Sequence, residues 1–145
     1  MELLIVTGRI SVELKYDNIK LINYRPLLYI VQQNNKQGIM NENGEIIGNI
    51  EFDSMGIIDR NNKNNLLILK NTANIELGII VCKDQKYGII NAKNGKFIVQ
   101  CELDNISYEI ENNNIVYYIE INNQKATLER YINYINTTVV NLQND

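Results

Sequence analysis

The stretch KYGIINAKNGKFIVQ, Lys86 to Gln100, contains Asn94-Gly95 between two apolar runs. Asn-Gly is a strong β-hairpin signal because both residues tolerate the positive φ angles of a type I′ turn. A degenerate copy, KQGIMNENGEIIG from Lys36 to Gly48, carries Asn43-Gly44 at the matching place. The sequence therefore predicts two hairpins, one at each Asn-Gly pair.

The register of the second hairpin follows if Asn94-Gly95 form the whole loop. Apolar side chains then meet on one face, with the cross-strand pairs Ala92 and Phe97, Ile90 and Val99, Gly88 and Cys101. The other face, which we expect to meet water, carries Asn91, Lys93, Lys96 and Gln100, with Ile89 and Ile98 as exceptions. The first copy is one residue shorter between its glycines, so a turn or bulge must absorb the difference.

A second phrase recurs beside the hairpins: Tyr16-Asp17-Asn18-Ile19, Phe52-Asp53-Ser54-Met55 and Leu103-Asp104-Asn105-Ile106. We expect the repeated Asp to be a turn or capping residue. The alternation predicts a single mainly β domain of antiparallel hairpins, in three irregular units placed roughly at 1–50, 51–101 and 102–145. An insertion from Asp59 to Glu76 lengthens the middle unit, and KATLERYINYI replaces the hairpin of the last unit.

The C-terminal segment has two interpretations. Apolar residues at helical spacing favour a short terminal helix: Leu128, Ile132, Ile135, Val139 and Leu142. The strand-forming residues in the same segment favour a strand: Tyr131, Thr137, Thr138, Val139 and Val140. Both remain open for residues 125–142.

The composition excludes the commonest enzyme and metal chemistry. The 145 residues include no His, and the two cysteines, Cys82 and Cys101, have no CxxC spacing. Without His, the usual general base near neutral pH and the ordinary zinc site are missing. We therefore expect no catalytic residue, no metal, no cofactor and two buried, inert thiols. An enzyme that uses carboxylates alone is the alternative.

The apolar runs are short. The N-terminal run from Leu3 to Val6 follows Glu2 rather than a basic residue, so it predicts a first strand and not a signal peptide. The longest run, Leu77 to Cys82, is strand-sized. We expect a cytoplasmic protein without membrane association.

Charge is distributed unevenly along the chain. Residues 1–101 carry 12 basic and 10 acidic side chains, a net of +2, whereas residues 102–145 carry 2 basic and 7 acidic, a net of −5. In the last third, alternation around an Asn112-Asn113-Asn114 turn predicts a core face with Ile106, Tyr108, Ile110, Ile115, Tyr117, Ile119 and Ile121. The opposite face presents the four candidate partner-binding residues Glu109, Glu111, Tyr118 and Glu120.

That acidic tyrosine face is either an ordinary solvated strand face or a docking surface for a basic protein. Direct nucleic-acid binding is disfavoured, because it needs clustered cations. The only lysine cluster is flanked by Asp84 and fits hairpin solvation: Lys83, Lys86, Lys93 and Lys96 around Tyr87.

The hairpin phrases resemble the unit of the bacterial WG, or KWG, repeat proteins, which reads approximately Lys-Trp-Gly-aromatic-Ile, a polar turn ending in Gly-Lys, an apolar strand and aromatic-Asp-x-Ile. Two stretches follow that order, Lys86-Tyr87-Gly88-Ile89-Ile90-Asn91 and Lys36-Gln37-Gly38-Ile39-Met40-Asn41. Tyr87 and Gln37 stand where the family has Trp, and the third unit keeps only Lys125. The resemblance implies a β-rich repeat array used for binding, with no catalytic residues.

Two functions fit these observations. One is a non-catalytic protein-binding module of the WG-repeat type. The other is a small acidic stoichiometric inhibitor that occludes a basic nuclease or toxin, as a phage anti-defence or anti-CRISPR protein, or a toxin-immunity protein, would. The repeat pattern favours the first, whereas the small size and the acidic C-terminal third favour the second.

Overall fold

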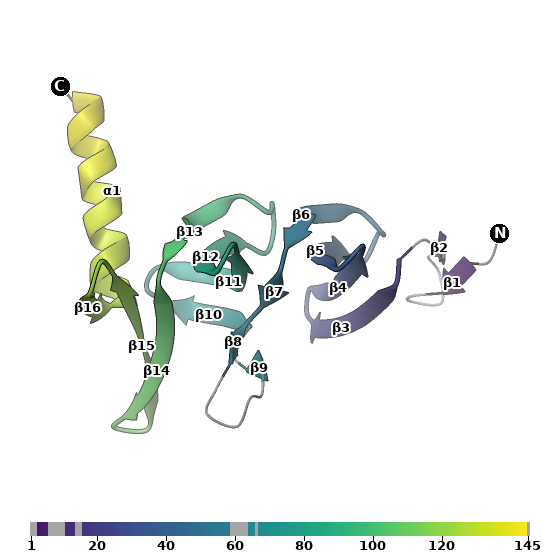
Figure 1. The fold of residues 1–145 in the computed structure, drawn as a ribbon, viewed down its shortest axis with the longest axis horizontal. Coiled ribbons are helices and arrows are strands. Elements are labelled where there is room, and N and C mark those ends of the chain that lie inside the picture. The colour runs from purple at the N-terminus through teal and green to yellow at the C-terminus, as the bar shows by residue number, and fades with distance from the viewer. Residues whose placement is uncertain (1–2, 6–10, 14–15, 59–63, 66, 145) are drawn as a thin grey trace.

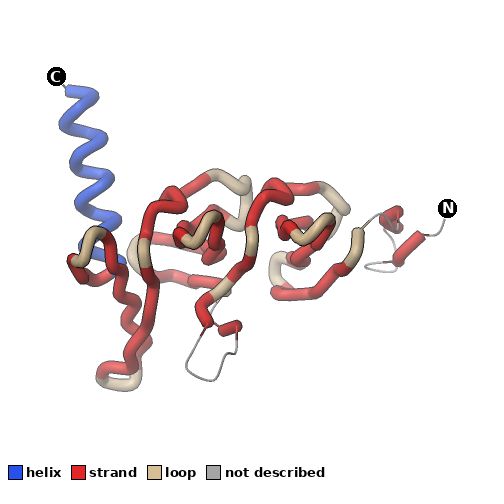
Figure 2. The backbone as a smooth tube through the Cα atoms, viewed as in Figure 1, coloured by secondary structure: helices blue, strands red, loops and turns tan. Residues whose placement is uncertain are grey.

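The computed structural model describes residues 3–5, 11–13, 16–58, 64–65 and 67–144. Antiparallel strands dominate this part of the chain, and a single helix follows the last strand (Figure 1, Figure 2). Three sheets succeed one another from the N-terminal side of the molecule to the C-terminal side. The mainly β fold class predicted from the sequence is confirmed.

Each sheet is built from consecutive strands. The first contains β3 (Asn18–Tyr24), β4 (Leu27–Gln33), β5 (Lys36–Asn41) and β6 (Ile46–Phe52) in that order. The second contains β10 (Ile68–Thr72), β11 (Ile75–Lys83), β12 (Lys86–Asn91) and β13 (Phe97–Leu103), and β7 (Ser54–Met55) also pairs with β11. The third contains β14 (Asn105–Glu111), β15 (Asn114–Ile121) and β16 (Gln124–Thr127), followed by helix α1 (Leu128–Asn144). Two short pairs complete the described strands: β1 (Leu3–Ile5) with β2 (Ser11–Glu13), and β8 (Ile57–Ile58) with β9 (Asn64–Asn65).

Five hairpins close with two consecutive residues of positive φ, the signature of a type I′ turn. The pairs are Asn34-Asn35, Ala73-Asn74, Asp84-Gln85, Asn112-Asn113 and Asn122-Asn123. Asn supplies most of these positions because its short polar side chain tolerates the left-handed region better than other non-glycine residues. The Asn-rich composition is thus used to form tight turns.

The two Asn-Gly pairs lie where predicted, between β5 and β6 and between β12 and β13, so both hairpins are confirmed. Their loops are longer than two residues. Asn41 N donates to Glu45 O at 2.9 Å around loop 42–44, and Asn91 N donates to Lys96 O at 2.7 Å around loop 92–95. Only the glycines have positive φ, 78° at Gly44 and 73° at Gly95. The one-residue difference between the copies is therefore absorbed in the loop.

The predicted register of the second hairpin is wrong. Ile90 faces Phe97 and Ile89 faces Val99, with an irregularity between them. The face expected to meet water is exposed at Lys93, Lys96 and Gln100, but Ile89, the exception on that face, is 0% exposed. Ile90, assigned to the apolar face, is 1% exposed. Phe97, assigned to the buried face, is 37% exposed. Ile89 and Ile90 are both buried because the second sheet is packed on both faces.

The packing on these two faces divides the core into clusters. Ile90 packs with residues of the first sheet, including Leu28, Ile39 and Phe52. Ile89 packs with residues of the third sheet and α1, including Ile119 and Leu128. A smaller cluster on the outer face of the first sheet contains Tyr29, Val31 and Met40. Adjacent sheets therefore share their hydrophobic cores in sequence along the molecule.

The insertion in the middle unit is shorter than predicted. Gly56 N donates to Ile80 O at 2.9 Å, and Ile80 N donates to Leu67 O at 2.8 Å. The chain thus leaves the sheet after Gly56 and returns at Leu67, opposite the same residue of β11. Residues 68–76 of the predicted insertion belong to the regular β10–β11 hairpin, while residues 59–63 and 66 lie outside the described part of the chain.

The C-terminal segment is a helix from Leu128 onward, so the helical interpretation is confirmed and the strand ends at Thr127. Arg130 N donates to Thr127 Oγ1 at 3.2 Å, which caps the first turn. Leu128 and Ile132 are buried against the third sheet. Within the described residues, no helix has the length and apolar character needed to cross a membrane.

Candidate protein-binding face of the third sheet

The four candidate residues lie on one face of the third sheet. Residues directly opposite each other in an antiparallel ladder point to the same side, and every second residue along a strand does so too. Glu109 and Glu111 alternate on β14, and Tyr118 and Glu120 on β15 occupy the same side, since Ser107 faces Tyr118 and Asn105 faces Glu120. Glu109 and Glu111 are exposed, and Tyr118 and Glu120 are partly exposed. We call this surface the acidic tyrosine face.

Contacts within the acidic tyrosine face hold Tyr118 in place. Its hydroxyl donates to Glu111 Oε1 at 3.1 Å, and this hydrogen bond, with the charges of Glu111 and Glu109, raises the pKa of Tyr118. The ammonium of Lys125 lies 4.9 Å from the centre of the Tyr118 ring, within cation–π range. Lys125 also faces Glu120 across the β15–β16 ladder. The aromatic ring is therefore oriented between a carboxylate and an ammonium group.

Two other carboxylates of the acidic C-terminal third are exposed but make contacts within the chain. Glu102 accepts a hydrogen bond from the Tyr131 hydroxyl at 2.9 Å, joining β13 to α1. Asp104 forms an ion pair with Lys86. The acidic tyrosine face holds three of the six described acidic side chains of this third, Glu109, Glu111 and Glu120.

The repeated aspartates have a structural role, as the sequence predicted. Each carboxylate accepts a hydrogen bond from the first backbone amide of a type I′ turn: Asn34 N to Asp17 at 2.9 Å, Asp84 N to Asp53 at 2.8 Å and Asn122 N to Asp104 at 2.9 Å. Lys36 forms an ion pair with Asp53 in the same way that Lys86 does with Asp104. These lysine and amide hydrogen bonds lower the pKa of Asp53 and of Asp104. Both carboxylates are thereby held ionised as turn anchors.

Three of the four lysines in the cluster of the second hairpin form ion pairs with described carboxylates. Lys83 pairs with Glu51 at 3.8 Å, Lys93 with Glu76 at 2.8 Å and Lys86 with Asp104. Charges neutralised in this way contribute little to phosphate binding. The pairing agrees with the expectation that this cluster solvates a hairpin.

The core face of the β14–β15 hairpin differs in part from the prediction. Ile106, Tyr117 and Ile119 are buried, but Ile110 is 70% exposed and Ile115 is 45% exposed. These two isoleucines face each other next to the Asn112-Asn113 turn, where the hairpin extends past the neighbouring sheet (Figure 1). Alternation identified the face correctly, but it carries no signal for where the core ends.

The two cysteines are only partly buried, which corrects the prediction of fully buried thiols. Desolvation nevertheless raises the pKa of Cys82, and it raises the pKa of Cys101 to about 11. Both groups are thus held as thiols near neutral pH. In the part of the chain that the structure describes, no three Cys, Asp or Glu side chains are grouped closely enough to hold a metal ion.

The three turns anchored by Asp align the repeats residue by residue. Lys36, Lys86 and Gln124 directly follow the turn in the three units, and the next position holds Gln37, Tyr87 and Lys125. The sequence comparison treated Lys125 as the counterpart of the repeated lysine, and the structure corrects this. Lys125 occupies the position of Tyr87. No protein-family model, no curated protein and no solved structure matches the chain.

Proposed function

We propose that this protein is a non-catalytic binding module of the WG-repeat type that docks on a basic protein surface through its acidic tyrosine face. The observation that carries the proposal is the common orientation of Glu109, Glu111, Tyr118 and Glu120 on one side of the third sheet. Surface carboxylates attract a cationic partner over distances of about a Debye length, and a tyrosine supplies contact area at a low entropic cost.

The arrangement of the face supports this role. Tyr118 is oriented before any partner binds, because Glu111 and Lys125 hold its hydroxyl and its ring. A side chain that is already ordered loses less conformational entropy on binding than a mobile one. The two glutamates of β14 are exposed and lie at the free edge of the sheet, where a partner can approach them.

A stoichiometric inhibitor of a basic nuclease or toxin is the second candidate, and one observation favours it. Residues 102–145 carry a net charge of −5, and the third sheet and α1 formed from this segment lie at one end of the molecule (Figure 1), which gives the protein an acidic end. Such an end can occlude a basic active site by occupation alone, without turnover.

The test begins with an affinity pull-down from the source cell, with and without phage infection, identified by mass spectrometry. Binding of the captured partner is then measured with Glu109→Lys/Glu111→Lys. We expect slower association and weaker binding, most visible at low salt, with little change in folding because exposed-strand substitutions alter stability by about 0.5 kcal/mol or less.

Glu42→Lys/Glu45→Lys is the matched control, because it makes the same charge change on the exposed β5–β6 loop of the first sheet. Equal loss of binding in both double variants would show a general charge effect and contradict the proposed face. Titration separates the two candidates: an inhibitor abolishes the partner's activity at a fixed molar ratio, whereas a binding module leaves that activity measurable at saturation.

A further inference from the structure

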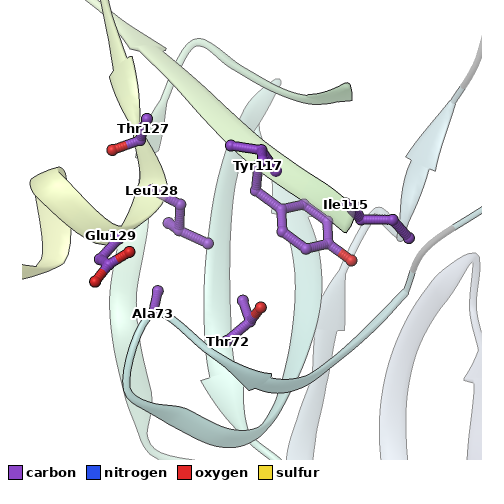
Figure 3. A pocket seen from close by; sticks show the side chains of 8 residues that line it. Thr72, Ala73, Ile115, Tyr117, Thr127, Leu128 and Glu129 are labelled. Carbon is purple, nitrogen blue, oxygen red and sulfur yellow. The ribbon is translucent and has the colours of Figure 1, made fainter. Parts of the chain in front are cut away.

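A pocket of about 150 Å³ lies where the β10–β11 turn, β15 and the start of α1 meet (Figure 3). Its apolar lining includes Ala73, Ile115, Tyr117 and Leu128, and its polar lining is Thr72, Thr127 and Glu129. Tyr117 extends across the pocket between Leu128 and Ile115, and Glu129 lies at the opposite end beside Ala73. The lining is thus apolar between Leu128 and Ile115 and acidic at Glu129 (Figure 3).

Two polar groups of this pocket have no partner within the described part of the chain. Tyr117 is 9% exposed, and its hydroxyl makes no hydrogen bond to a described residue. Glu129, an exposed residue, forms no ion pair with a described lysine or arginine. No side-chain nitrogen or oxygen among the described residues is both buried and without a hydrogen-bond partner, so the Tyr117 hydroxyl carries no desolvation penalty. It offers an acceptor to a donor that enters the pocket.

We propose that this pocket receives a lysine or arginine side chain of the protein partner. The aliphatic stem would lie along Leu128 and the Tyr117 ring, and the cationic group would pair with the Glu129 carboxylate or donate to the Tyr117 hydroxyl. The inference rests on the proposed function, because it takes the partner to be basic. It adds a specific anchor to the general attraction of the acidic tyrosine face.

The lining discriminates between classes of ligand. An anion would be repelled by the Glu129 carboxylate, so it is disfavoured. A purely apolar side chain would make no ion pair with the Glu129 carboxylate. Lysine and arginine combine a long apolar stem with a terminal cation, which matches both parts of the lining.

The experiment uses ¹H–¹⁵N correlation spectra of the full chain titrated with N-acetyl-arginine amide, N-acetyl-lysine amide and N-acetyl-norleucine amide. Norleucine has a lysine-like stem without the ammonium group. We expect saturable shifts at the amides of Thr72, Ala73 and Glu129 with the two cationic probes and weaker shifts with norleucine. Equal shifts with all three probes would overturn the requirement for a cation, and no shift with any probe would overturn the site.

Glu129→Gln tests the acidic end of the pocket. We expect it to weaken the cationic probes by about two- to fivefold, the range typical of an exposed ion pair. Glu45→Gln, on the β5–β6 loop, is the control and leaves their affinity unchanged. With the captured partner, a loss of binding in Glu109→Lys/Glu111→Lys but none in Glu129→Gln would overturn the pocket and keep the proposed function. A loss of binding in Glu129→Gln but none in Glu109→Lys/Glu111→Lys would support the pocket and contradict docking through the acidic tyrosine face.

Discussion

Lys86 on β12 forms an ion pair with Asp104, the residue that separates the second sheet from the third. The second oxygen of Asp104 accepts a hydrogen bond from Asn122 N at 2.9 Å. One carboxylate therefore joins the start of a strand in one sheet to a hairpin turn in the next. Lys36, Asp53 and Asp84 repeat this arrangement between the first and second sheets.

Stability should depend on the two aspartate anchors at acidic pH. The pKa of Asp53 and of Asp104 is lowered below the ordinary 3.8, so their contribution is present above about pH 4 and is lost as the pH falls through the folded values. Asp53→Asn/Asp104→Asn should reduce the free energy of unfolding near neutral pH and flatten its decline in acid. Urea denaturation as a function of pH measures both effects, with Glu42→Gln as the control. An unchanged acid profile would mean that these ion pairs do not stabilise the fold.

Gly95 should tolerate no side chain. A Cβ built there would lie 1.5 Å from Ile47 O, and its φ is 73°. Gly95→Ala should cost about 3 kcal/mol or more, because overpacking adds to backbone strain. Gly44→Ala, at a φ of 78° in the first copy, should cost only about 1 kcal/mol. Chemical denaturation compares the two variants, and equal losses would show that the contact between the first and second sheets does not limit Gly95.

The stability that Tyr131 contributes by joining α1 to β13 should decrease at alkaline pH. Burial and the hydrogen bond to Glu102 raise its pKa to about 12, so the neutral phenol is favoured by folding. This contribution is complete below the ordinary phenol pKa of about 10 and is lost as the pH rises toward 12. Tyr131→Phe should cost about 0.5–1.5 kcal/mol at neutral pH and remove part of the alkaline destabilisation. Tyr24→Phe, 75% exposed at the other end of the molecule, is the control in a phenolate absorbance titration.

The thiols should react slowly in the native protein. The raised pKa values of Cys82 and Cys101 leave little thiolate at about pH 8, and thiolate is the nucleophile. Alkylation by iodoacetamide, followed by mass spectrometry, should be much faster in denaturant than in buffer. Single variants Cys82→Ser and Cys101→Ser assign the rates, and we expect Cys101 to be the slower of the two. Equal native and denatured rates would contradict the role of desolvation.

The hairpins could be predicted from sequence, but their register could not. Asn94-Gly95 indicates a turn because both residues allow positive φ, yet only Gly95 adopts it. The longer loop lets Gly95 approach Ile47 in the first sheet, and such a tertiary contact leaves no local pattern. Alternation also assumes one wet face, so it could not reveal that Ile89 and Ile90 both lie in cores.

The acidic tyrosine face was easier to anticipate than the pocket. Its members alternate along two strands joined by a polar turn, and a period of two determines which side they share. The pocket combines Ala73 of the second sheet with Tyr117 and Glu129 of the third sheet and helix, which are far apart in sequence. The pocket forms only when the sheets pack together, so no local sequence pattern predicts it.

The two adjacent isoleucines of β12 couple the second sheet to both of its neighbours. Because Ile89 contacts the C-terminal cluster and Ile90 the N-terminal one, a strain that separates β12 from its neighbours disturbs both. Unfolding under force or denaturant should then follow a one-dimensional model in which each sheet is stabilised by its contacts with the adjacent sheets. Each outer sheet can unfold locally without the other, whereas unfolding of the second sheet removes packing contacts from both outer sheets.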